Sequence, residues 1–151
     1  MKDIGNVACF CGSSASLRSN SLIYNGKTFG NGHAYICDRF PACRGSVGVH
    51  PDGRPLGTIP DFETKKLRIK VHALIDPLWK DSDNGRPKRR NRASVYGWLK
   101  RIMGATTHVH VGEMSKADCL RAMECIAANP YRQHRSEWTT KERVKTDGEK
   151  V

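Results

Sequence analysis

Residues 7–50 read VACFCGSSASLRSNSLIYNGKTFGNGHAYICDRFPACRGSVGVH and contain four of the six cysteines of the chain. Cys9 and Cys11 are separated by one residue, and Cys37 and Cys43 by five. This pairing is open to three interpretations: a disulfide framework, buried free thiols or a metal site. The opening residues do not resemble a signal peptide, so we expect a cytoplasmic protein whose thiols stay reduced. That expectation favours the metal site.

The residues between the two pairs predict how the pairs meet. Segment 25–32 (NGKTFGNG) is typical of a turn, and its flanks 21–24 (SLIY) and 33–37 (HAYIC) are typical of strands. A hairpin places the second pair beside the first, so that four thiolates can surround one zinc ion at about 2.3 Å. Such a closed site leaves no position for a substrate, and we expect one structural zinc ion. Its expected ligands are Cys9, Cys11, Cys37 and Cys43.

The charge of the chain indicates its partner. Its 151 residues carry a formal net charge of +11, which is typical of proteins that bind nucleic acid or an anionic surface. The alternative is a soluble basic protein without such a partner. No apolar run approaches the roughly 18 residues of a membrane span, and no glycine-rich phosphate loop is present. We therefore expect nucleic acid as the partner, with no membrane and no small-molecule substrate.

The cysteine-rich segment resembles known zinc ribbons. The pattern C-x-C-G at 9–12, followed by YICDRFPAC at 35–43, is similar to the C-terminal zinc ribbons of bacterial type I topoisomerases, in which an aromatic-proline step lies between the last two cysteines. Phe40-Pro41 matches that step.

A longer resemblance covers roughly residues 7–128. The stretches 35–61, HALIDPLW at 72–79 and VYGWLKRIMG at 95–104 resemble a family of phage-encoded zinc-finger-containing domains. The family usually has C-x-x-C at its first knuckle, where this chain has C-x-C, so His33 and His50 are alternatives to Cys9 as the fourth ligand. The resemblance implies a zinc-binding protein of a bacteriophage or prophage, acting on nucleic acid in the cytoplasm of an infected bacterium. It implies no reaction.

Beyond the ribbon, apolar spacing predicts helices. Residue 61 is an expected N-cap aspartate for a helix over 62–76, which Pro77 would end. A second helix is expected from about Ala93 to a cap at Gly104. We expect these helices to cover one face of the ribbon.

A third helix is expected after Ser115, whose partner Asp118 stands three residues on, and it should stop at Asn129-Pro130. The side chains expected to face inward are Leu120, Met123, Ile126 and Ala127. The predicted fold class is α+β: a small four-cysteine zinc β-ribbon (1–60), a compact unit of about three α-helices (61–130) and a charged, flexible tail (131–151).

Segment 80–92 (KDSDNGRPKRRNR) has no apolar residue besides one proline and is expected to be a mobile basic loop. The alternative to phosphate binding is a merely solvated loop.

Aromatic residues lie among the cations of the ribbon, and an exposed ring can stack on a base at about 1–3 kcal/mol. We expect Tyr35 in the core and Phe40 at the surface. Further cations are expected on the ribbon and on the polar side of the first helix, among them Arg18, Lys65 and Arg68. The expected nucleic-acid contacts are Arg39, Phe40, Arg44, Lys66, Lys70, Arg86, Lys88, Arg89, Arg90 and Arg92.

Two pairs of potential metal ligands, each with at least one histidine, raise the question of catalysis. His72 and Asp76 share a helix face, and His108 and His110 share one side of an extended segment, so together they can supply a second metal site. No recognised nuclease signature frames them, and we expect no enzymatic activity. The leading function is nucleic-acid binding, with DNA preferred and single strands included. Binding of a host transcription or defence protein is the alternative, and a metal-dependent nuclease is the third.

Overall fold

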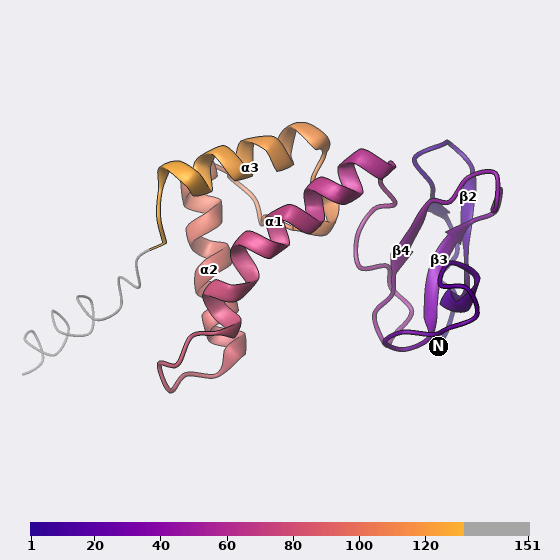
Figure 1. The fold of residues 1–151 in the computed structure, drawn as a ribbon, viewed down its shortest axis with the longest axis horizontal. Coiled ribbons are helices and arrows are strands. Elements are labelled where there is room, and N and C mark those ends of the chain that lie inside the picture. Colours follow the sequence, from indigo (N-terminus) through magenta and orange to yellow (C-terminus); the bar gives the residue numbers. More distant parts are fainter. Residues whose placement is uncertain (132–151) are drawn as a thin grey trace, which may run out of the picture.

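The computed structural model describes residues 1–131, and its N-terminal part is one antiparallel sheet with the strand order β1-β2-β3-β4 (Figure 1). The strands are β1 (Val7–Ala8), β2 (Ser14–Ser19), β3 (His33–Cys37) and β4 (Ser46–Gly48). Three helices, α1 to α3, follow at the other end of the molecule (Figure 1). The fold is therefore α+β, with the small ribbon preceding the helices, as predicted.

The first strand of the expected hairpin lies earlier than predicted. Residues 21–24 are not a strand: the short 3-10 helix η1 (Asn20–Leu22) begins this region, and β2 pairs with β3 instead. The buried side chain of Asn20 closes the connecting loop, because its amide donates to Phe29 O at 2.8 Å and accepts from Phe29 N at 3.3 Å. β2 reads SASLRS and lacks strong apolar alternation, so its pairing with β3 was not visible in the sequence.

The inner face of the sheet has its own small core. Tyr35 pairs with Leu17 on one side and with Val47 on the other, and it is fully buried, as predicted. Its hydroxyl donates to Gly53 O at 2.6 Å and accepts from Ile4 N at 3.1 Å. The ribbon therefore covers Tyr35 with its own loops rather than with the helices.

Helix α1 (Phe62–Lys80) runs from the sheet across the helical unit (Figure 1). Asp61 is its N-cap, as predicted, and accepts from Thr64 N at 2.8 Å. The predicted end at Pro77 is wrong, because the proline lies inside the helix. A proline in the last turn removes one backbone hydrogen bond, while the residues after it, Leu78 and Trp79, gain contacts with the core.

Helix α2 (Lys88–Met103) begins five residues earlier than expected, so residues 88–92 of the basic segment 80–92 are helical rather than a loop. Gly104 caps its C-terminal end in the left-handed conformation, as predicted. The part of the segment before Lys88 connects α1 to α2.

Helix α3 (Lys116–Ala128) starts with the expected capping box of Ser115 and Asp118. Its expected inward face is partly wrong. Leu120 and Ala127 are exposed, Met123 and Ile126 are half-buried against the core, and the fully buried positions are Cys119 and Ala122. The core of the helical unit joins residues from all three helices and the short 3-10 helix η2 (Val111–Glu113): Val71, Ile75, Val95, Trp98, Leu99, Met103, Val111, Met114, Cys119 and Ala122.

Arg68 joins the connector after the ribbon to the helical unit. Its guanidinium is buried, where the sequence placed it on an exposed polar face. It donates to Thr58 O at 2.8 Å, to Thr58 Oγ1 at 2.7 Å and to Met114 O at 2.9 Å. A second link is a backbone contact at Gly57, where a Cβ atom would stand 2.0 Å from Gly112 O. These contacts hold the end of α1 that lies near the sheet.

Candidate metal centre and surrounding surface

The four predicted ligands come together at one end of the sheet. Cys9 and Cys11 lie in the turn between β1 and β2, Cys37 ends β3, and Cys43 lies in the loop before β4. Their sulfur atoms all lie within 4.8 Å of one another. Sγ of Cys9 is 3.7 Å from Sγ of Cys43, and Sγ of Cys11 is 3.6 Å from Sγ of Cys37. Ligands at about 2.3 Å from a tetrahedral zinc ion stand about 3.8 Å apart, so the cluster suits a single structural zinc ion.

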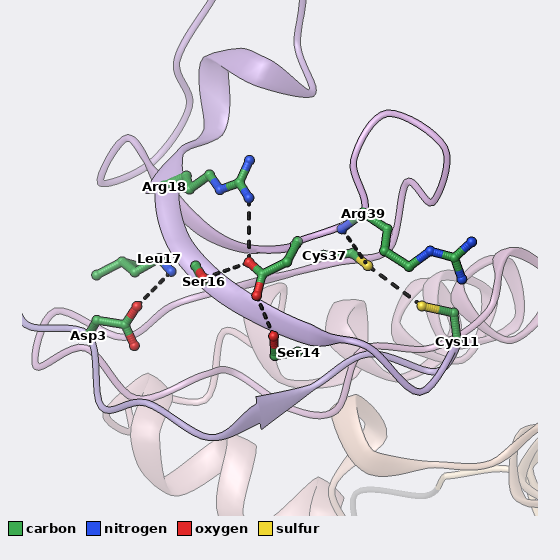
Figure 2. A network of polar contacts seen from close by, with 9 residues as sticks. Asp3, Cys11, Ser14, Ser16, Leu17, Arg18, Cys37 and Arg39 are labelled. Atoms are coloured by element: carbon green, nitrogen blue, oxygen red, sulfur yellow. Dashed lines mark hydrogen bonds and ion pairs between the residues drawn. The ribbon is translucent and has the colours of Figure 1, made fainter.

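Backbone amides of both knuckles point at the sulfur atoms. Arg39 N donates to Sγ of Cys37 at 3.4 Å (Figure 2). The backbone N–H of Ser13 lowers the pKa of the Cys11 thiol to about 7. Donors of this kind stabilise the thiolate form, which is the form that binds a metal.

Burial acts in the opposite direction on two of the ligands. It raises the pKa of Cys9 to about 12 and also raises the pKa of Cys37. A thiol that coordinates zinc is deprotonated, so bound zinc would compensate the cost of burying these two sulfur atoms as thiolates. The donor set and its burial therefore fit zinc. With four thiolates the coordination is complete, and the role of the ion is to hold the ribbon together.

Gly45 is a site residue that the sequence analysis missed. It is buried beside the cluster, where a Cβ atom would stand 2.5 Å from Cys9 Sγ and 3.0 Å from Ile59 Cγ2. Only glycine allows the backbone this close to the sulfur. The visible signal was a glycine two residues after the last ligand cysteine, and it could not be separated from an ordinary turn glycine.

The sequence model of a family described as zinc-finger-containing domain matches residues 5–129. The chain belongs to this family. No curated protein and no solved structure gave a significant match. Because the four clustered cysteines all lie inside the matched range, the zinc finger of this domain is the ribbon described above.

The cations expected to bind nucleic acid lie in three places on the domain. Arg39 and Arg44 lie at the second knuckle, where the guanidinium of Arg44 stands 5.1 Å from the ring centre of Phe40. Lys66 and Lys70 are exposed on α1, and Lys66 stands over the ring of Phe62. The remaining group is at the start of α2: Arg86, Lys88, Arg89, Arg90 and Arg92.

These cations are not equally available. Lys88 Nζ donates to Lys80 O and to Ser82 O and so closes the α1–α2 connection. Arg92 stands 4.4 Å from the ring centre of Tyr96. Arg18, which the sequence placed among the free cations of the ribbon, is 3.4 Å from the Asp38 carboxylate, which also accepts from the hydroxyls of Ser14 and Ser16 (Figure 2).

The exposed aromatic residues of the ribbon differ from the expectation. Phe40 is half-buried, whereas Phe10, Tyr24 and Phe29 are 53%, 45% and 57% exposed. Tyr24 and Phe29 form an edge-to-face pair with ring centres 4.7 Å apart in the loop between η1 and β3. Stacking on a single strand is therefore sterically easier at these rings than at Phe40.

The histidine pairs do not assemble into a second cluster in the described residues. Among residues 1–131, the four cysteines are the one group in which three or more potential ligand atoms share a common position. Nδ1 of His72 is 3.5 Å from Asp76 Oδ1 without hydrogen-bond geometry, and that carboxylate also binds Lys80 and Trp79. The rings of His108 and His110 are 6.3 Å apart. Within the same residues, no helix combines the length and the hydropathy needed to span a membrane.

Proposed function

We propose that this domain is a phage or prophage protein that binds nucleic acid in the cytoplasm of the bacterial host, with DNA preferred and single strands included. The observation that carries the proposal is that the cations expected to contact nucleic acid are not neutralised by acidic side chains. None of the nine cations expected to contact nucleic acid has an ion-pair partner within residues 1–131, whereas other cations of the domain, such as Arg54 and Lys116, do.

The first turn of α2 supports the proposal most strongly. It contains Lys88, Arg89 and Arg90 but no acidic residue, and its N-cap, Pro87, makes no side-chain hydrogen bond. Cations at a helix N-terminus oppose the helix dipole and destabilise the helix slightly. Lys88 donates to Lys80 O and Ser82 O, whereas Arg89 and Arg90 have no ion-pair partner within residues 1–131. Cations that break a local rule in this way are typical of a binding function, and a phosphate would satisfy these two side chains.

The test is a salt-titrated binding assay with single- and double-stranded DNA and RNA. Changing Arg89 and Arg90 to alanine should weaken binding to all sequences and reduce the salt slope by up to about two units, because two phosphate contacts are lost. The control removes two cations that are already paired, as Arg54→Ala with Lys116→Ala, and should change the slope less. Phe40→Ala should weaken single-strand binding with little change in slope, since stacking releases no counterions.

An arginine pair that is neutral in affinity and slope would refute this use of α2. A host protein would then be the better candidate partner, and exposed apolar residues near Leu22 and Phe29 favour that alternative. These are 44% and 57% exposed, and binding would be sought by capture of host transcription or defence proteins of known identity.

A further inference from the structure

A cleft of about 670 Å³ lies between the sheet and the helical unit. One wall is a single face of α1 at helical spacing: Lys65, Arg68, Ile69 and His72. The opposite wall comes from β3, β4 and the loop after η1, and Arg92 and Tyr96 of α2 extend the helical side. The expectation that the helices cover the ribbon is therefore wrong for Ile23 and Val47, which line this cleft instead.

The lining is cationic. It contains three cations and four of the six histidines of the chain but no aspartate or glutamate. The histidines are His33, His50, His72 and His110. A concave surface whose charges share one sign concentrates counter-ions of the opposite sign. The lining is therefore suited to an anionic ligand.

The three cations lack anionic partners within residues 1–131. Arg68 donates only to carbonyl oxygens and one hydroxyl, and Arg92 lies over the ring of Tyr96. Lys65 donates to Ser46 Oγ at 3.4 Å, and burial lowers its pKa. Lys65 is an exposed residue, and its ammonium, which has no carboxylate partner, can reach an anion in the cleft.

The same cleft exposes apolar surface. Tyr24, Leu56 and Ile69 are 45%, 53% and 60% exposed and all line it. Unpaired cations can bind the phosphate of an unpaired nucleotide, and the open apolar and aromatic surface beside them can bind its base. The volume lies in the range of about 300–1,000 Å³ that accommodates a small ligand, so it suits about one or two nucleotides and not a duplex.

We propose that this cleft is the site where the domain holds unpaired nucleotides of a single strand, with a phosphate at Lys65 and a base against Tyr24. The inference rests on the proposed function and adds a site to it. Arg92 belongs both to the cleft and to the cationic start of α2, so a strand in the cleft can continue onto that surface.

Two neighbouring residue pairs give matched tests. Lys65 lines the cleft and Lys66, the next residue of α1, does not; Tyr24 lines it and its ring partner Phe29 does not. Lys65→Gln should weaken binding of a single-stranded oligonucleotide at least about threefold more than Lys66→Gln. Tyr24→Ala should weaken it by about fivefold or more, and Phe29→Ala by less. Zinc content and urea midpoint of each full-length variant report whether its fold is intact.

The outcomes separate the two proposals. Larger losses for Lys65 and Tyr24 on single-stranded DNA or RNA than on duplex support the cleft. If the wild-type protein binds but the members of each pair behave alike, the cleft is not the site and the proposed function stands. Equal cleft-dependent losses on duplex DNA overturn the single-strand assignment. If the wild-type protein binds no nucleic acid at about 50 mM salt, the proposed function fails and the cleft proposal with it.

Discussion

Gly45→Ala should damage the zinc site without removing any ligand. The added Cβ atom would stand 2.5 Å from Cys9 Sγ, 3.0 Å from Ile59 Cγ2 and 3.3 Å from Phe10 Cε1. Cys9 is 5% exposed and Ile59 is 4% exposed, so neither side chain can move toward solvent. The sulfur must shift by several tenths of an ångström, and this distorts the tetrahedron.

The expected cost is that of overpacking a core, about 1–3 kcal/mol. Because structural zinc binding is coupled to folding of the ribbon, this cost should appear as a zinc affinity lower by roughly 5–150-fold, at about tenfold per 1.4 kcal/mol. The measurement is competition for zinc against a chromophoric chelator, together with urea unfolding of the zinc-loaded protein.

Gly48→Ala is the matched control in the same sheet. Its Cβ atom would meet only Leu56, with Cδ1 at 2.7 Å, and that side chain is 53% exposed and free to rotate away. Its zinc affinity should stay within about threefold of wild type, since surface changes of this kind cost about 0.5 kcal/mol. If Gly45→Ala binds zinc as tightly as Gly48→Ala, the close approach of the backbone to the sulfur is not a constraint on the site, and this reasoning is wrong.

Further predictions test the rest of the domain. Cys37→Ser should abolish stoichiometric zinc by elemental analysis and unfold the ribbon, as seen by loss of amide protection in β3; retained zinc would contradict the four-thiolate site. Arg68→Met should lower the unfolding free energy by about 1–3 kcal/mol in urea, because it leaves the Met114 carbonyl oxygen without its buried donor; a change under about 0.5 kcal/mol would refute its bridging role. Hydrogen bonds from Thr64 lower the pKa of the Asp61 carboxyl group in the folded protein. The stability that Asp61 contributes is therefore present above its unfolded pKa near 4 and is lost as the pH falls through the lower folded pKa. The urea midpoints of wild type and Asp61→Ala should differ at pH 7 and converge below about pH 3. No nuclease activity is expected with magnesium, manganese or zinc, and metal-dependent cleavage that His72→Ala or His110→Ala abolishes would show that the domain is an enzyme.

The metal ligands could be read from the sequence because zinc chemistry is local. Thiolates that come in closely spaced pairs within glycine- and proline-rich turns are typical ligands of a structural zinc ion. The departure from C-x-x-C at the first knuckle did not matter for the geometry: Sγ of Cys9 lies within the cluster, so neither His33 nor His50 is needed as a fourth ligand. The helix caps at Asp61, Ser115 and Gly104 were also predicted, since each depends on only a few neighbouring residues.

The predicted boundaries of helices and strands are wrong where contacts between distant segments override local conformational preference. The helix continues through Pro77 because the last turn packs on the core, and β2 exists because a polar segment pairs with an apolar strand. Residues 88–92 are helical because they dock against the end of α1, where Lys88 donates to Lys80 O, the last carbonyl of that helix, and to Ser82 O just beyond it.

The sequence by itself determined the metal, its four ligands, the α+β class and the cationic character, because each depends on residue type and short spacing. Only the tertiary structure decided which cations are paired, buried or free. Lys65 and Lys66 are adjacent and chemically alike, yet one faces the cleft and the other faces away, because a turn of 100° separates neighbours on a helix. The same holds for Gly45, whose importance comes from a sulfur 36 residues earlier in the chain. Such properties arise from contacts between distant segments, and no local pattern encodes them.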